Sequence, residues 1–171
     1  MTLLKKSTLF ACLFLPTALF SQSLFPELTG KTLQDKTLTI PNDTKGKFTI
    51  LCLTYSQKSS DVLQNWLQPI YETFLTDPDY DVHMYFVPML SGIKELAAGT
   101  IEKKMKQGFD PQLHPYILLY KGEIGDYKKT LNMTEKDIPY FFVLNKEGKI
   151  VHQVSGNYTD AKMEKMSEIV E

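Results

Sequence analysis

The stretch "TILCLTYSQKSSDVLQNWLQP", residues 49–69, contains the local change of pattern that decides the fold. Residues 47–55 are apolar on both alternating faces and rich in β-branched side chains, which is typical of a buried central strand. A polar turn at 55–60 comes next. From about residue 59 to 75 the apolar side chains recur on one helical face, and serines are available to cap its start. The pattern predicts a buried strand, a tight turn and an amphipathic helix that Pro69 should kink.

The rest of the chain continues this alternation of strands and helices. The elements expected from periodicity and turn residues are two short strands at 31–34 and 37–40, a buried strand at 81–89, a helix at 91–108, a short strand within 114–123, a short helix at 124–133, a hairpin at 138–156 and a closing helix at 159–171. The hairpin is the strongest of these signals, because a turn ending in Gly148 separates two apolar runs. This order predicts a mixed α/β sheet covered by helices.

The first 23 residues have the layout of a secretory signal peptide. Lys5 and Lys6 precede an apolar stretch, and the small-residue pattern Ser21-Gln22-Ser23 follows it. A transmembrane anchor is the weaker interpretation, because the apolar run is shorter than the roughly 20 residues that a spanning helix needs and Pro16 interrupts it. A lipid anchor on Cys12 is weaker still, since few residues separate it from Lys6.

Cleavage near Gln22 or Leu24 would leave one domain of ordinary size. We expect residues 1–23 to be the signal peptide and residues 24–171 to form a single domain with its own core. The mature chain is expected in the periplasm or outside the cell. It has no further apolar stretch long enough to span a membrane.

Charge and cysteine content exclude two classes of function. The formal net charge is −1 and every basic residue is lysine, so no arginine fork is present to read phosphates or guanines, and nucleic acid is not an expected partner. Only Cys52 remains after loss of the signal peptide, so the mature protein cannot form an internal disulfide. Its place between Leu51 and Leu53 predicts a buried, inert cysteine.

Four segments in this order resemble the thioredoxin-like superfamily, specifically its exported thioredoxin/peroxiredoxin-related branch. They are Phe25-Pro26 with Gly30, the strand–turn–helix at 48–75, Ile138-Pro139-Tyr140, and the hairpin "LNKEGKIVHQVSG" at 144–156. The resemblance implies an α/β fold with a thioredoxin-like mixed sheet flanked by helices and an N-terminal β-hairpin. It also implies that the Ile138–Pro139 bond is cis and lies opposite the turn at 56–61.

The chain departs from that superfamily at the catalytic atoms. The two cysteines of the CxxC motif would fall at Ser56 and Ser59, or near 58 and 61 in another register, and no residue after Cys52 is cysteine. The exchange reaction needs a thiolate activated at a helix N-terminus and a second sulfur to resolve the mixed disulfide. A serine hydroxyl supplies neither, so thiol–disulfide exchange at this turn is excluded.

A second resemblance fits the missing cysteines. The Atp10 family of mitochondrial ATP synthase assembly factors is also thioredoxin-like without a CxxC motif. The segment "NWLQPIYETF" at 65–74 is similar to its Trp-x-x-Pro-aromatic helix, and "PYFFVLNKEGKIVHQVSG" at 139–156 to its Tyr-containing strand and hairpin. The Arg-Trp pair of that hairpin is replaced here by Val151-His152. The resemblance implies a role in assembly.

Two hypotheses about function follow. The first is a non-catalytic module that binds a protein or extended peptide of the cell envelope, or assists assembly, without cofactor or metal. Its expected binding surface comprises Ser56, Gln57, Lys58, Ser59, Ser60, Ile138, Pro139 and Tyr140, with Trp66 if that side chain is exposed. The alternative is an enzyme on the same fold, redox or other, in which Ser56, Lys58, Ser59 or Asp61 acts with a distant histidine.

The histidines give little support to the alternative. His83, His114 and His152 lack the spacing of known metal motifs. His83 and His152 are expected on strands, so a weak metal site would form only if these strands were neighbours.

Overall fold

The computed structural model describes residues 23–92 and 95–171, so the expected signal peptide lies outside the described residues except for Ser23. The described elements, in chain order, are β1 (Leu28–Thr32), β2 (Thr37–Ile40), the 3₁₀ turn η1 (Asn42–Thr44), β3 (Phe48–Thr54), α1 (Gln57–Ile70), the π-helical turn η2 (Tyr71–Leu75), β4 (Val82–Leu90), α2 (Glu95–Gly108), the 3₁₀ helix η3 (Pro111–Tyr116), β5 (Leu118–Lys121), α3 (Gly125–Thr130), β6 (Tyr140–Leu144), β7 (Ile150–Ser155) and α4 (Asp160–Val170). These elements confirm the expected alternation, with η3 as an addition.

The strands form one seven-stranded sheet in the order β2-β1-β5-β4-β3-β6-β7. Strands β3, β4 and β5 are parallel, whereas β6 runs antiparallel to β3 and to β7, and β1 antiparallel to β5 and β2. The sheet is therefore mixed and carries an N-terminal hairpin, as expected. The first strand of that hairpin begins three residues earlier than its pattern predicted, at Leu28.

Strand β3 lies at the centre of the sheet. It pairs with β4 on one edge and β6 on the other, so that Cys52 is level with Phe86 and Phe141. Its residues 49–54 are all buried, which explains why the sequence is apolar on both faces there.

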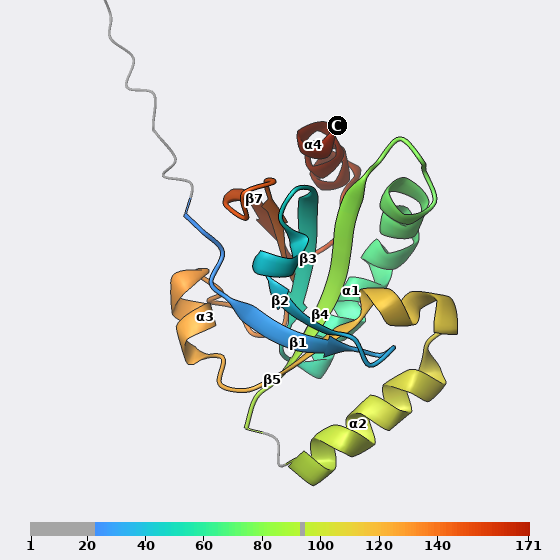
Figure 1. Cartoon of the computed structure of the whole chain (residues 1–171), viewed down its shortest axis with the longest axis vertical. Coiled ribbons are helices and arrows are strands. Elements are labelled where there is room, and N and C mark those ends of the chain that lie inside the picture. The colour runs from blue at the N-terminus through green and yellow to red at the C-terminus, as the bar shows by residue number, and fades with distance from the viewer. Residues whose placement is uncertain (1–22, 93–94) are drawn as a thin grey trace, which may run out of the picture.

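Helices cover both faces of this sheet, with α1 and α4 on one side and α3 on the other (Figure 1). Trp66 of α1 is fully buried, lies 4.3 Å from the ring of Phe141 between centroids, and donates its indole N–H to the carbonyl of Gly156 at 3.0 Å. On the opposite face, Phe25 is fully buried with its ring 5.8 Å from that of Phe142. The chain before β1 therefore belongs to the core.

Gly30 allows the hairpin to approach β5. A Cβ atom at this position would lie 2.8 Å from Cγ of Leu118 and 2.9 Å from the carbonyl oxygen of Leu119. A larger residue would push β1 away from the sheet, since cores are closely packed.

Helix α1 begins earlier than its apolar pattern predicted. Ser56 is its N-cap, whereas the sequence indicated Ser59 or Ser60. The expected single helix to residue 75 is an α-helix to Ile70 followed by the π-helical turn η2. Pro69 lies inside α1 just before this change of geometry, and a proline cannot donate the usual backbone hydrogen bond.

Two tyrosines attach the loop before β6 to the end of β3. Tyr55 O–H donates to the carbonyl oxygens of Glu135 at 2.7 Å and Met133 at 3.2 Å. Tyr140 O–H donates to Glu135 O at 3.0 Å and accepts from Glu135 N at 2.7 Å. The two rings stack with centroids 6.4 Å apart. This arrangement places the loop directly beside the start of α1.

We expect Cys52→Ser to lower the free energy of unfolding by about 1–3 kcal/mol, because a hydroxyl would be buried among apolar side chains without a partner. Burial also raises the pKa of the Cys52 thiol well above its usual range. Urea unfolding followed by circular dichroism measures the change. Cys52→Ala, which adds no hydroxyl, is the control and should cost less. Equal stability of Cys52→Ser and wild type would contradict the assigned packing.

Tyr55 should make stability depend on alkaline pH. Burial, and then the neighbouring Tyr140, Asp137 and Glu135, raise the pKa of Tyr55 from 10.0 to about 12. The folded state therefore holds this proton more tightly than the unfolded state, and the associated stability is complete below pH 10 and lost as pH rises through about 12. Urea unfolding at about pH 9 and about pH 11 should show a smaller decline for Tyr55→Phe than for wild type. Identical declines would count against the Tyr55 contacts.

Candidate functional site

The start of α1 is closed by two serines. Ser56 Oγ accepts from the backbone N–H of Ser59 at 3.0 Å, and Ser59 Oγ accepts from the backbone N–H of Ser56 at 3.1 Å, which together form a capping box. Their hydroxyl oxygens lie 3.3 Å apart. Of the two registers considered for the missing cysteines, Ser56 and Ser59 are thus the pair that the fold brings together. Hydroxyls committed to capping are not poised as nucleophiles.

A carboxylate faces this helix start. Ser56 Oγ donates to Asp137 Oδ1 at 3.0 Å, and Lys58 Nζ lies 3.6 Å from Asp137 Oδ2. The positive end of a helix favours a negative group nearby, the same effect that lowers the pKa of cysteines at helix N-termini. Asp137 thus places a carboxyl group beside the start of α1, where a negative group is favoured. Sequence reasoning missed Asp137, although its place directly before Ile138-Pro139 was an available signal.

The loop at 138–140 lies beside the helix start as expected, but one expected detail is wrong. The Ile138–Pro139 bond is trans; among the described residues the cis bond is Ile40–Pro41. Trans is the intrinsically favoured form of an X–Pro bond, and here Pro139 O accepts from Gly156 N at 3.0 Å. Because Asp137 and the tyrosines hold the loop, it reaches the turn without the cis geometry.

The expected binding surface divides into an exposed part and a buried support. Gln57 and Lys58 are exposed, and Ser56, Ser60 and Ile138 are partly exposed. Ser59, Pro139, Tyr140 and Trp66 are buried, so they shape the surface from beneath and do not present side chains to a partner. Trp66 was expected to contribute only if exposed, and it does not. We call the accessible part, which comprises Ser56, Gln57, Lys58, Ser60 and Ile138, the platform.

Main-chain groups on the platform are unpaired. Within the described part of the chain, no hydrogen bond involves the backbone N–H or carbonyl of Ile138, or the backbone N–H of Gln57 or Lys58. The two helical amides belong to the first turn of α1, where no intrahelical acceptor exists. The site can therefore offer both donors and an acceptor to an added polypeptide.

A groove opens beside the platform. It encloses about 740 Å³ between α1 on one side and α2 with η3 on the other, and Tyr55, Ser56 and Gln57 line its near end. This volume is typical of a ligand or peptide pocket. Periodicity did not reveal the groove, because the apolar side chains of α1 that line it belong to the same helical face as the buried Trp66 and Ile70.

The described residues form neither a metal site nor a helix that could span a membrane. His83 is level with Thr49 on β3, and His152 with Val143 on β6, so two strands separate these histidines and the weak metal site does not form. The described residues contain no cluster of three or more histidine, cysteine or acidic side chains that could hold a metal. Within 23–92 and 95–171, every helix is too short or too polar to cross a membrane.

Solved structures of thioredoxin-like proteins resemble this one. The pneumococcal exposed lipoprotein thioredoxin Etrx1 from Streptococcus pneumoniae strain TIGR4 is 18% identical, with 83% of this chain and 97% of that chain covered and a TM-score of 0.59. A putative protein disulfide isomerase from Bacteroides thetaiotaomicron is 16% identical over 87% and 89% of the two chains, with a TM-score of 0.58. Yeast Sco1 is 16% identical over 86% and 97%, with a TM-score of 0.54. At these identities the likeness shows the fold alone, which is thioredoxin-like.

The sequence comparison identifies the family. No curated protein matches the chain significantly. The profile of the ATP10 protein family matches residues 14–171. That range includes both segments, 65–74 and 139–156, in which the sequence is similar to the Atp10 family. The chain therefore belongs to the ATP10 protein family and has a thioredoxin-like fold that lacks the paired cysteines.

Proposed function

We propose that this protein is an assembly factor that holds a polypeptide partner on the platform without catalysing thiol chemistry. Membership of the ATP10 family supports the assembly role. The non-catalytic role is supported by the helix start, where Ser56, Ser59 and Asp137 satisfy one another in place of a reactive sulfur. Cys52, the one cysteine among the described residues, is fully buried in the sheet.

The unpaired main-chain groups of Ile138, Gln57 and Lys58 carry this proposal. An extended peptide that lies across the loop and the start of α1 can pair with both backbone groups of Ile138, as in the addition of a strand to an edge. It can also accept from the two helical amides. This mode of binding uses hydrogen bonds of the main chain and needs no sulfur on either partner.

The cellular location of the partner follows from the proposed export of the chain. We propose that residues 1–23 direct export and that the partner is a protein of the cell envelope, with an energy-converting complex such as an ATP synthase as the class that the family name suggests. Near-neutral charge without arginine supports a protein partner over a nucleic acid.

A partner-capture experiment tests whether the platform binds the partner. Tagged protein is used to purify partners from the native envelope, followed by mass spectrometry. Ile138→Glu should abolish capture, because it replaces an apolar side chain by a charged one and puts a second negative charge beside Asp137. Gln57→Pro should weaken capture relative to Gln57→Ala, since proline removes the N–H of the first helical residue and is tolerated there.

Lys104→Gln, an exposed change on α2, serves as the control and should capture like wild type. Unaltered capture by both Ile138→Glu and Gln57→Pro would contradict the proposal that the platform binds the partner. A steady rate of insulin reduction that depends on Cys52 would defeat the non-catalytic assignment.

Export is tested by the intact mass of the protein recovered from its native cell. We expect a mature chain that begins near Gln22 or Leu24, since the small residues Ser21 and Ser23 suit signal peptidase. Retention of the N-terminal residues, or a lipid adduct on Cys12, would refute this expectation.

A further inference from the structure

The groove beside the platform has two apolar walls. On one wall, Leu63 and Leu67 of α1 and Tyr71 at the start of η2 follow one another at intervals of four residues and line it. Leu67 is partly exposed and Tyr71 is 37% exposed, one of the few large apolar side chains that the described surface leaves open. On the other wall, Ile101 and Met105 of α2 are also four residues apart. Residues at this spacing share one helical face, so both walls present continuous apolar stripes.

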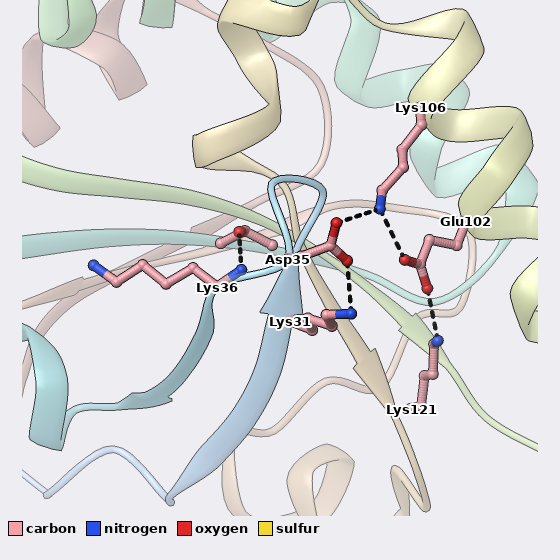
Figure 2. Close-up of polar contacts among 7 residues, drawn as sticks. Lys31, Asp35, Lys36, Glu102, Lys106 and Lys121 are labelled. Carbon is pink, nitrogen blue, oxygen red and sulfur yellow. Dashed lines mark hydrogen bonds and ion pairs between the residues drawn. The ribbon is translucent and has the colours of Figure 1, made fainter.

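Charged residues fix α2 in place on its other side (Figure 2). Glu102 lies 2.9 Å from Lys121 of β5 and 3.3 Å from Lys106, and Lys106 lies 3.0 Å from Asp35 at the tip of the β1–β2 hairpin. Asp35 also pairs with Lys31 at 2.6 Å, and these lysines lower the pKa of Asp35 to about 2. These ion pairs hold Lys106 on the hairpin side, whereas Ile101 and Met105 line the groove.

The rim of the groove is acidic. The chain has 19 basic residues, all lysine, yet none of the described residues that line the groove is a lysine. Asp61 and Asp110 lie on the rim, exposed, and neither belongs to an ion pair within the described part of the chain. An apolar occupant with basic residues beside its apolar run is complementary to this rim.

The floor of the groove selects a helical occupant. It includes Phe86 and Pro88 of β4 and Ile117 just before β5. Strand β4 is paired with β3 on one edge and β5 on the other, so the floor offers no free strand edge to an extended peptide. An occupant there contacts side chains alone, and its own backbone must be satisfied internally, as it is in a helix.

We infer that the groove between α1 and α2 binds an apolar α-helix that carries lysine or arginine next to its apolar face. This inference rests on the proposed function, because the groove opens at the platform and would receive the part of the partner that continues from it. The helix is the third member of a packed set with α1 and α2, and the basic residues pair with Asp61 and Asp110.

The test uses a fluorescein-labelled helical peptide of about 18 residues, long enough for a stable helix, composed of leucine and alanine with lysines at both ends. A matched peptide has glutamates in place of the lysines. Binding of each peptide to the intact mature chain, which contains the described domain, is measured by fluorescence anisotropy. We expect the lysine peptide to bind, and the glutamate peptide to bind at least about tenfold more weakly.

Three variants locate the site. Leu67→Gln should weaken binding of the lysine peptide at least about tenfold, because it places an amide in the apolar wall. Leu24→Gln, at a side chain that is 57% exposed and outside the groove, is the matched control and should bind like wild type. The double variant Asp61→Asn with Asp110→Asn should remove most of the preference for lysine over glutamate ends.

Several results would overturn the inference: no binding of the lysine peptide to the wild type, equal binding by Leu67→Gln, or equal affinity for the two peptides. Far-ultraviolet circular dichroism of each variant confirms that the fold is retained. The titration contains no native partner, so a negative result would count against the groove alone. The proposal that the platform binds the partner is tested separately, by the capture experiment with the Ile138 and Gln57 variants.

Discussion

Burial of β3 on both faces and along both edges is the constraint on which the rest of the structure depends. A strand paired on each side has no free backbone group for solvent, and its side chains must be apolar above and below. Helices must therefore cover both faces. Only two residues separate the end of β3 from the first of them, α1, so the position of the strand fixes where the positive end of the helix lies. The site follows from this geometry: a helix start at the end of a rigid central strand is held in place by the core beneath it.

At this helix start, serine hydroxyls and a facing carboxylate meet the electrostatic preference of the helix. The first turn of any helix leaves amides that need acceptors and favours a nearby negative charge. A thiolate would satisfy that preference and remain reactive. Here the hydroxyls of Ser56 and Ser59 accept two amides, and the carboxylate of Asp137 supplies the charge from the facing loop. The arrangement leaves main-chain groups of Gln57, Lys58 and Ile138 without hydrogen-bond partners among the described residues.

The second feature of the surface, the groove, arises because α2 stands apart from the main layers. Its apolar contacts gather near its C-terminal end, where Met105 and Phe109 pack against a small cluster around Leu33, Ile117 and Leu119. Ion pairs at the tip of the hairpin supplement these contacts, although exposed pairs each contribute little to stability. A helix attached in this way leaves space between itself and α1. The N-terminal hairpin thus has a role beyond extending the sheet, since it positions one wall of the groove.

The sequence by itself determined the strands and helices, the mixed α/β class, the burial of Cys52 and the absence of a cysteine pair at the start of α1. These depend on local periodicity and on which atoms are present. It did not determine that Ser56 is the N-cap of α1, a choice that is stabilised by Asp137, which is 81 positions further along the chain. Nor did it show that Trp66 and Tyr140 are buried, that Ile138–Pro139 is trans, or that α1 and α2 enclose a groove. Periodicity tells which face of a helix is apolar, but whether that face is covered by the core, by another helix or by nothing depends on how distant segments pack, and only the tertiary structure decides this.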